Sequence, residues 1–404
     1  MDAGGVNAES DGLPNELYYG DNIDVLRHLI GLGRGGTIKM VYIDPPFATK
    51  SVFECRDRTP AYEDLRVGAQ YVEFVRKRLV LLRRLLSDDG SIYVHLDSTM
   101  VFHIKVIMDE VFGEKNFRGM ITRKKCSNKN YTKRTYGDVA DYILFYSKTE
   151  RYVWNRPYTE WTEEKTMEQY PCQDEEGRRY KRVPLHAPGV RNGETGKDWR
   201  GMSPPPGKHW QYPPSKLEEL DRNGEIYWSK NGNPRRIVYF DDNRQGISVQ
   251  NIWTGYQDSK NQNDRVTGYP TEKNLDLLKQ IVQASTDEGD VVLDCFCGSG
   301  STLEAAFRLN RRWIGADNSM EAVKSTVGRF TLGVGRHGAE DATEQPSSDG
   351  KCPFALLSSR TDAIRIAEEF RGVLIKKDGA TAVDDVEREI KPSNASEKDA
   401  STSV

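Results

Sequence analysis

The chain has 404 residues, of which 37% are hydrophobic, and its 58 lysines and arginines against 61 aspartates and glutamates give a net charge of −3. This length suffices for one large domain and a smaller one, and the charge excludes a protein that is basic over its whole surface, so any contact with nucleic acid is local. We expect no membrane span and no export signal, since no apolar run is long enough, and therefore a cytoplasmic location.

The six cysteines lack the paired spacing of a zinc site, so we expect buried thiols and no metal. Residues 1–15 are rich in Gly, Ser and acids and are expected to form a flexible N-terminus. Alternating strands and helices follow over residues 16–149. In chain order we predict a strand at 17–19, a helix at 23–30, a strand at 38–43, a helix at 71–86, a strand at 91–96, a helix at 101–112, and strands at 120–123 and 142–146.

The helix predicted at 71–86 places apolar residues on one face and arginines and a lysine on the other, and Ser87–Gly90 is expected to end it. His95 and Asp97, on and just after the next strand, are assigned structural roles, because a lone histidine is more often satisfied by packing or a backbone partner.

Basic and aromatic side chains gather between the last two strands of this region. They are Arg123, Lys124, Lys125, Lys129, Tyr131, Lys133 and Arg134. Cations interleaved with aromatic rings suit phosphates and an unstacked base, so these residues are candidates for DNA binding. The pattern alone leaves the alternative of a solvated hairpin tip open.

Residues 150–267 differ in character, because prolines, glycines and six of the seven tryptophans cluster there without clear periodicity. We predict a separate, irregular, β-rich domain, with the tryptophans mainly in its core. Its basic candidates for contact with DNA are Lys208, His209, Lys216, Lys230, Arg235 and Arg236.

Residues 268–335 carry the most informative stretch, VVLDCFCGSGST at Val291–Thr302. Three apolar residues lead into Asp294, glycines follow at Gly298 and Gly300, and a helix is predicted from Ser301, which is the pattern of a strand, a tight turn and a helix. Glycines let a nucleotide-like ligand lie against bare backbone at the positive end of the helix. The next strand ends at Asp317, at the spacing where an acid meets ribose hydroxyls, so the two motifs predict an adenosine site.

The remaining residues, 336–404, form a polar C-terminal extension. A short strand at 352–357 and a helix at 363–374 are predicted there, and residues 392–404 are expected to be disordered.

A second motif, Asp44-Pro45-Pro46-Phe47, closes the strand at 38–43. With the glycine motif late, DPPF early and an irregular domain between them, the chain resembles the β group of amino-DNA methyltransferases, which includes modification subunits of restriction systems. The resemblance implies an α/β fold, with a Rossmann-like methyltransferase sheet that is permuted in sequence and an inserted, irregular, β-rich target-recognition domain.

The resemblance also implies S-adenosylmethionine as cofactor, bound by residues at both ends of the chain. These are Asp21, Asp294, Phe296, Gly298, Gly300, Thr302, Asp317, Thr271 and Lys273. Family members often carry Glu at the position of Asp317, and the segment before the glycine motif often begins His-Pro-Thr-Gln-Lys-Pro, from which Tyr269, Glu272 and Asn274 depart.

The chemistry explains the DPPF motif. An exocyclic amino nitrogen is a poor nucleophile because its lone pair is delocalised into the ring. If the Asp44 carboxylate and the Pro45 carbonyl each accept an amino hydrogen, the nitrogen moves toward tetrahedral geometry and its growing positive charge is stabilised. Pro46 stiffens the turn, and Phe47 is expected to stack on a target base flipped out of the duplex.

The sequence therefore predicts a methyltransferase that acts on adenine N6 in double-stranded DNA. Methylation of cytosine N4, and a catalytically silent DNA-binding partner, stay open as alternatives. A homodimer and a cognate restriction nuclease also stay open as partners.

Overall fold

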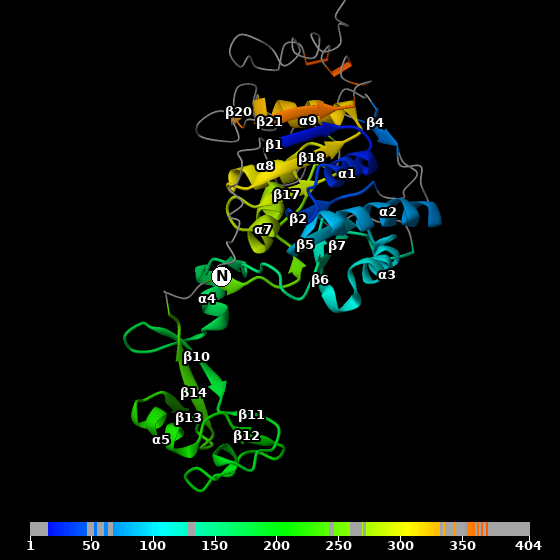
Figure 1. Cartoon of the computed structure of the whole chain (residues 1–404). Helices are drawn as coiled ribbons and strands as arrows, with labels where there is room; N and C mark the ends of the chain where they lie inside the picture. The colour runs from blue at the N-terminus through cyan, green and yellow to red at the C-terminus, as the bar shows by residue number, and fades with distance from the viewer. Residues whose placement is uncertain are drawn as a thin grey trace, which may run out of the picture. The chain divides into compact units, whose positions relative to one another are not determined.

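The computed structural model describes residues 15–46, 52–54, 60–63, 68–127, 134–241, 246–258, 269, 272–331, 334–335, 343–344, 352, 354–359, 362, 365–366 and 369–370. The chain forms two compact units. Unit 1 consists of Met1–Pro157 and Gln250–Val404, and unit 2 of Tyr158–Val249. Figure 1 shows unit 2 in green and the rest of the chain in the other colours of the bar.

Unit 1 is built on a nine-stranded sheet. Across the sheet the strands are β16 (Ile252–Trp253), β6 (Phe117–Lys124), β7 (Ala140–Ser147), β5 (Leu86–Leu96), β2 (Ile38–Ile43), β17 (Val291–Asp294), β18 (Arg312–Asp317), β1 (Asn15–Tyr19) and β21 (Phe354–Ser358). Every neighbouring pair is parallel except those of β7, which runs antiparallel to β5 and β6. Strands from the end of the chain lie between strands from its beginning, so the predicted permuted α/β fold is confirmed.

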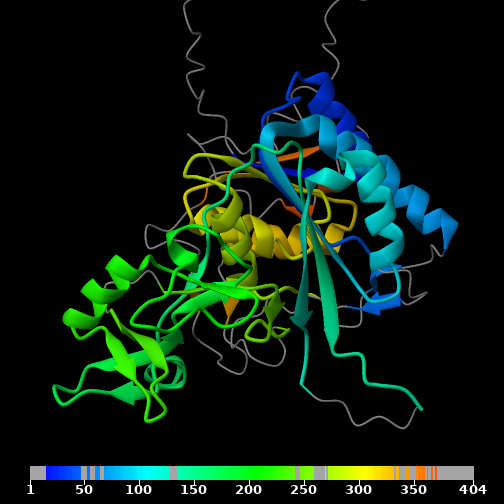
Figure 2. The same cartoon turned by 90° about the horizontal axis from the view of Figure 1, so that it is seen from below.

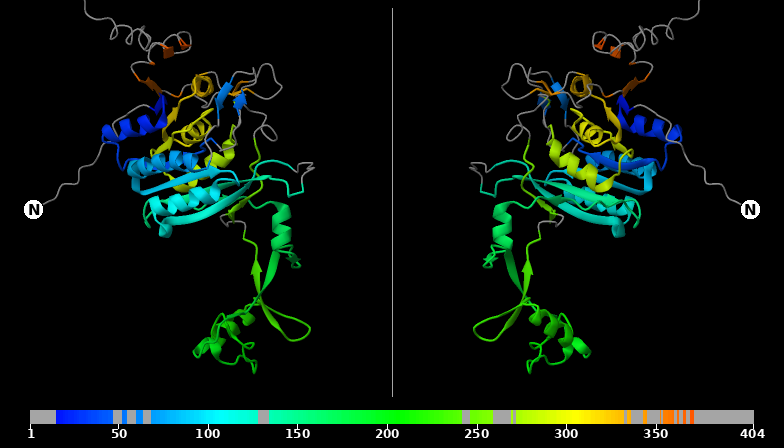
Figure 3. Two further views of the ribbon diagram at one scale, coloured as in Figure 1. Left: turned by 90° about the vertical axis from the view of Figure 1, so that its right-hand side faces the viewer. Right: turned by 90° about the vertical axis from the view of Figure 1, so that its left-hand side faces the viewer.

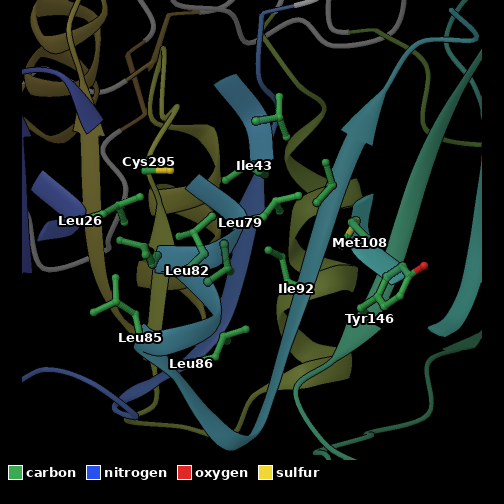
Figure 4. Close-up of a cluster of buried hydrophobic side chains, with 14 of the residues drawn as sticks. Leu26, Ile43, Leu79, Leu82, Leu85, Leu86, Ile92, Met108, Tyr146 and Cys295 are labelled. Carbon is green, nitrogen blue, oxygen red and sulfur yellow. The ribbon is translucent and has the colours of Figure 1, made fainter. Parts of the chain in front are cut away.

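Helices cover both faces of this sheet (Figures 1 and 3). α1 (Asn22–Gly31), α2 (Ala69–Leu85) and α3 (Val101–Phe112) pack on one face, where Leu26, Leu79, Leu82, Ile92 and Met108 belong to one buried cluster (Figure 4). On the other face lie α7 (Leu275–Ser285), α8 (Ser301–Arg308) and α9 (Met320–Thr331). Buried contacts on both faces explain why the central strands are almost continuously apolar.

The predicted end of the second helix is wrong in one respect. The polar run Ser87–Gly90 lies within β5, not in a turn after the helix. Between the pairs Ile38↔Leu86 and Met40↔Ser91, β5 advances by more residues than β2, so the run forms a bulge. Glycine suits position 90, since a Cβ atom there would lie only 3.0 Å from the carbonyl oxygens of Ile38 and Lys39.

Two edge strands come from segments that the sequence placed outside the catalytic region. β16 pairs with β6, although residues 150–267 were predicted to form the separate domain, and β21 pairs with β1 from within the C-terminal extension. Each contributes backbone hydrogen bonds to a sheet edge, which periodicity cannot reveal in such short strands. The helix predicted at 363–374 lies largely outside the described residues, and the segment 392–404 lies wholly outside them.

The smaller elements of unit 1 are η1 (Glu114–Asn116) and the antiparallel pairs β3 (Val52–Glu54) with β4 (Pro60–Glu63) and β19 (Val334–Gly335) with β20 (Thr343–Glu344). β6 and β7 form the long hairpin seen in Figure 2.

The described part of unit 2 contains short strands and two α-helices. They are β8 (Tyr158–Thr159), α4 (Glu163–Gln169), β9 (Cys172–Gln173), β10 (Arg179–Pro184), β11 (His186–Pro188), η2 (Glu194–Gly196), β12 (Lys208–Trp210), α5 (Pro214–Arg222), β13 (Ile226–Trp228), β14 (Pro234–Tyr239) and β15 (Ile247–Ser248). Its main sheet has the order β13-β14-β10-β9. Trp199 and Trp210 are buried in its core with Leu217, whereas Trp253 lies in unit 1.

Candidate active site

The two sequence motifs meet at the carboxyl ends of neighbouring strands. β2 and β17 pair in parallel through Met40↔Val292 and Val41↔Leu293. Asp44 directly follows β2, and Asp294 is the last residue of β17. Both line one cavity of about 370 Å³. Open parallel sheets place ligand sites at this edge, so the fold brings the motifs together although they are far apart in the sequence.

The glycine loop fits a ligand that lies against the backbone. Gly298 and Gly300 have φ angles of +51° and +77°, which side chains rarely adopt. A Cβ atom at Gly300 would lie 2.9 Å from Thr326, and one at Gly298 would lie 3.3 Å from the Tyr269 ring. The loop therefore needs glycine for both conformation and space, and α8 begins directly after it.

Two carboxylates, the buried Asp294 and the half-buried Asp317, lie beside this loop. Asp294 accepts a hydrogen bond from the backbone N–H of Phe296 at 3.0 Å, and Asp317 accepts one from the N–H of Gly298 at 2.9 Å. Burial raises the pKa of Asp294 to about 7, against the opposing hydrogen bonds from Thr302 and Phe296, and it also raises the pKa of Asp317. Both residues line the cavity and can accept hydrogen bonds from a cationic or hydroxyl-bearing ligand.

The two carboxylate oxygens of Asp44 differ in their partners. Oδ2 forms an ion pair with Lys273. Oδ1 is buried and has no hydrogen-bond partner among the described residues. A buried acceptor without a donor is costly, so Oδ1 is an acceptor site for a ligand that carries an N–H group. Pro45 and Pro46 line the same cavity, while Phe47 and Thr271 lie outside the described residues.

One wall of the cavity carries residues that we did not predict. Arg78, on the inward face of α2, donates to Asp21 at 2.8 Å and lies 3.6 Å from the centre of the Phe74 ring. Phe74 in turn contacts Phe296 edge to face, and Asn22 donates to the carbonyl of Cys295 at 2.7 Å. A signal was present, because an arginine on the apolar stripe of an amphipathic helix requires a buried partner.

A buried arginine contacts the glycine loop. Arg329 of α9 donates to the carbonyl of Ser299 at 2.6 Å and forms ion pairs with Glu272 and Glu304. Glu272 is one of the residues at which this segment departs from the His-Pro-Thr-Gln-Lys-Pro pattern. Its pairing with Arg329 ties the segment that carries Lys273 to the cofactor loop.

A chain of buried polar groups runs from the cavity wall to the β6–β7 hairpin. Tyr42 lines the cavity, and its hydroxyl lies 2.7 Å from Nδ1 of His95. Nε2 of His95 lies 3.3 Å from Asp141, which pairs with Arg123 at 3.2 Å and with Lys125 at 3.0 Å. Burial lowers the pKa of His95, so Nδ1 of the neutral ring accepts from the Tyr42 hydroxyl while Nε2 donates to Asp141.

This network corrects one expectation for the basic loop. Arg123 is fully buried and paired with Asp141 and Asp258, so it is not a surface cation that can meet phosphates. Lys125 is paired with Asp138 and Asp141. Lys124 is partly exposed and Arg134 exposed, whereas Lys129, Tyr131 and Lys133 lie outside the described residues.

Asp97 has the structural role that was expected. Its carboxylate accepts hydrogen bonds from the backbone N–H groups of Thr99 and Met100, both at 3.1 Å, at the start of α3.

Three of the basic candidates in unit 2 are already engaged. His209 is buried and its Nδ1 lies 2.7 Å from the carbonyl of Gly189, Lys216 pairs with Glu219, and Arg236 contacts Glu225 and Tyr212. Pairing within unit 2 makes these side chains poor candidates for binding phosphates.

Known proteins resemble this chain over most of its length. A family model described as DNA methylase, N6_N4_Mtase, matches residues 38–328. The type II methyltransferase M.EcaI of Enterobacter cloacae is 49% identical over 321 residues, which cover 80% of this chain and 70% of the relative. The Mod subunit of the type III restriction-modification enzyme StyLTI of Salmonella typhimurium is 29% identical over 344 residues, covering 75% of this chain and 51% of that subunit.

Among solved structures, the M1.HpyAVI complex with SAM aligns with a TM-score of 0.43 and 14% identity, over 78% of this chain and 98% of that one. No described helix of the present chain is both long and apolar enough to cross a membrane. On the family match and the identity to M.EcaI, this chain belongs to the N6_N4_Mtase family of S-adenosylmethionine-dependent DNA methylases, as the order of its motifs predicted.

Proposed function

We propose that this enzyme methylates the exocyclic N6 amino group of adenine within a short sequence of double-stranded DNA. The observation that carries the proposal is the buried Oδ1 of Asp44, which has no donor among the described residues and stands at a cavity that the glycine loop also lines. An amino group is the donor that this acceptor lacks. Aspartate at the head of the motif favours adenine, since relatives that modify cytosine often carry serine there.

S-adenosylmethionine, when bound, supplies a methyl group activated by a sulfonium. Gly298 and Gly300 would expose the backbone to it, and the buried Asp294 and the half-buried Asp317 would present acceptors. The described lining of the cavity includes the acids Asp21, Asp44, Glu272, Asp294 and Asp317, against the cations Arg78 and Lys273. This excess of acidic groups suits a positively charged cofactor.

Asp44 prepares the nucleophile. Its Oδ1 accepts one amino hydrogen and the Pro45 carbonyl accepts the other, which directs the nitrogen lone pair toward the methyl group. The new N–C bond replaces the bond between the methyl carbon and sulfur, which would leave the cofactor as a neutral thioether. The nitrogen then carries a positive charge that Asp44 stabilises, and it loses one proton to the carboxylate. Lys273 holds Oδ2, so the carboxylate keeps its orientation while Oδ1 faces the base.

The target base must leave the duplex to reach this cavity, because its amino group is inside the helix. We propose that Phe47 stacks on the flipped base and that Thr271 contacts the cofactor. Lys124, Lys129, Tyr131, Lys133 and Arg134 would hold the DNA backbone beside the β6–β7 hairpin. Unit 2, inserted between β7 and β16, would read the target sequence.

A restriction nuclease with the same target is the partner that such an activity fits, since methylation then protects the host sequence. The proposal includes a cytoplasmic location, where the cofactor and DNA occur together, and the five described cysteines are free thiols. Self-association as a homodimer belongs to the same proposal and is measured directly by sedimentation of the purified protein.

Single-molecule sequencing tests the reaction. Unmethylated plasmid is incubated with cofactor and with the wild type, Asp44→Ala or Asp24→Ala. Asp24 is an exposed acid on α1 that pairs with the exposed Arg27, so it is a matched control. We expect N6-methyladenine at one recurring sequence with the wild type and Asp24→Ala, and none with Asp44→Ala.

N4-methylcytosine at a recurring sequence would leave the proposed role of Asp44 intact but make cytosine, not adenine, the target base. Undiminished methylation by Asp44→Ala would overturn the mechanism, and cofactor binding without any methylation by the wild type would favour a silent DNA-binding partner.

A further inference from the structure

The main sheet of unit 2 carries an unusual charge. Its strands β9, β10, β13 and β14 contain the cations Arg179, Lys181, Arg182, Arg235 and Arg236 and no aspartate or glutamate. The whole chain has more acids than bases. Positive charge is therefore concentrated locally on this small sheet, as a binding surface for an anion requires in an acidic protein.

The register assigns these side chains to two faces. Arg236 pairs with Val183 and Ile226, so it lies on the face that packs on the tryptophan core of unit 2. Arg235 pairs with Tyr227 and Pro184 and therefore lies on the opposite face. Alternation along β10 and β14 adds Tyr180, Arg182 and Tyr239 to that face. We call Tyr180, Arg182, Tyr227, Arg235 and Tyr239 the Tyr/Arg face.

The guanidinium of Arg182 is held in position by aromatic rings. It lies 3.7 Å from the centre of the Tyr227 ring, and Nη2 donates to the Tyr180 hydroxyl at 3.0 Å. Its Nε is buried and has no acceptor among the described residues. Stacking removes rotamer freedom before any ligand arrives, which reduces the entropy cost of binding.

Among the described residues, acids neutralise some surface cations of unit 2, but not the two cations of this face. Within the described part of the chain, neither Arg182 nor Arg235 forms a salt bridge, whereas Arg178, Lys197, Arg200 and Lys216 elsewhere in unit 2 are all paired with acids. The charges of Arg182 and Arg235 are therefore not neutralised by an acid within the described residues, although they share this property with other cations of unit 2 such as Lys208 and Lys230.

We propose that the Tyr/Arg face is a contact surface for duplex DNA, with Arg182 and Arg235 on phosphates or guanine edges and the tyrosines against the sugar-phosphate backbone. The two arginines of this face match a polyanion, because guanidinium groups bind phosphate or guanine with two parallel hydrogen bonds. This inference rests on the proposed function, and it names the surface by which unit 2 would meet the substrate.

The test measures affinity for a duplex that contains the methylated sequence, as a function of salt, with the full-length protein. Arg182→Ala and Arg235→Ala are compared with Lys197→Ala, which removes a paired cation from unit 2 but not from this face. We expect each arginine variant to bind about tenfold more weakly and to lower the slope of log affinity against log salt by about 0.9 for each phosphate that it no longer neutralises. Lys197→Ala is expected to behave as the wild type.

Arg182→Lys separates charge from geometry. It keeps the positive charge and removes the planar group that stacks on Tyr227, so we expect it to retain part of the salt slope but to weaken binding. Cofactor binding, measured by calorimetry, is expected to stay unchanged in all variants because the cavity lies in unit 1. If Arg182→Ala also loses cofactor binding, its fold is disturbed, and Arg235→Ala alone decides the test.

The outcomes separate this inference from the proposed function. If the wild type methylates DNA and both arginine variants bind DNA as the wild type does, the Tyr/Arg face is not the contact surface and the proposed activity stands. If the wild type binds cofactor but neither binds nor methylates DNA, the proposed function is wrong, and the inference that rests on it is wrong with it. If the arginine variants lose only an association with a second protein, the face is a protein interface and the inference is overturned.

Discussion

Asp141→Asn is the substitution by which the buried network can be tested most directly. The asparagine keeps the size and one carbonyl oxygen of the aspartate but removes its charge. Asp141 has a side chain that is only 6% exposed and faces Arg123, whose side chain is 0% exposed, at 3.2 Å. The variant would leave Arg123 with Asp258 as its acidic partner, at 2.6 Å, and His95 with an amide in place of a carboxylate.

The expected cost follows from burial. Removing one partner of a buried ion pair destabilises a protein by about 3–5 kcal/mol, because the other charge stays buried without compensation. Since Asp258 still neutralises part of the charge on Arg123, we expect about 3 kcal/mol. An exposed pair such as Arg27–Asp24, with side chains 64% and 73% exposed, contributes at most about 1 kcal/mol, so Asp24→Asn is the matched control.

Urea unfolding of the two variants and the wild type measures the difference. We expect the midpoint to fall clearly for Asp141→Asn and to stay within error for Asp24→Asn. Equal midpoints for Asp141→Asn and the wild type would refute the reasoning, since Arg123 and His95 would then be stable without the carboxylate.

The pH dependence gives an independent check on the same network. Burial holds the pKa of His95 below its ordinary value of 6.5, so the neutral histidine contributes stability above pH 6.5 that is lost as the pH falls below it. Burial alone would raise the pKa of Asp141, but the hydrogen bond and charge of His95 and the charge of Lys125 hold it below its ordinary value of 3.8, so its contribution is lost only in stronger acid. We expect His95→Gln to flatten the stability profile below pH 6.5, and an unchanged profile would exclude His95 as the titrating group.

Three further predictions concern the cavity. Gly300→Ala is expected to weaken cofactor affinity at least about tenfold in calorimetry, because the added Cβ would lie 2.9 Å from Thr326 and the φ of +77° is strained for alanine. Unchanged affinity would contradict the proposal that the glycine loop binds the cofactor. Cofactor affinity is expected to rise between about pH 6 and pH 8, since the carboxyl of Asp294, with a pKa of about 7, gains a negative charge over that range and attracts a cationic ligand. We expect Asp294→Asn to abolish this rise in affinity. A rise that persists in the variant would assign the pH dependence to another group. Arg329→Met leaves Glu272 and Glu304 buried without this cation and is expected to destabilise the protein by about 3 kcal/mol or more in urea unfolding, so a variant of full stability would show that the two acids find other partners.

Local patterns were sufficient to predict the elements around the site. Apolar runs that end in an acid predicted β2, β17 and β18, and the glycines predicted the turn before α8. The positions of Asp44 and Asp294 followed, because each ends a strand and parallel strands share one carboxyl edge. The roles proposed for the individual site residues depend on side chains that meet only in three dimensions, and those remain predictions for mutagenesis.

Residues that act through a distant partner could not be predicted. In the sequence, Arg123 belongs to a run of basic residues. In the structure it pairs with Asp141 of β7 and with Asp258 from the segment after β16. Nothing in the sequence singles out Arg182, and only the register of β10, β13 and β14 places it on Tyr227. Charge runs show where cations are, but pairing across strands decides which of them are available to a ligand.

The permuted order of the motifs has a physical basis in the sheet. β17 lies between β2 and β18, and β1 lies beyond β18, so the cavity is formed by strand ends that are neighbours whichever segment of the chain comes first. A cofactor loop after β17 and an acceptor after β2 need only parallel pairing of those two strands, which Met40↔Val292 and Val41↔Leu293 provide. The link between β7 and β16 is then free to contain a unit of its own, since both strands already belong to the sheet. Unit 2 occupies this link, which is why a separate unit can be inserted without altering the geometry of Asp44 and the glycine loop.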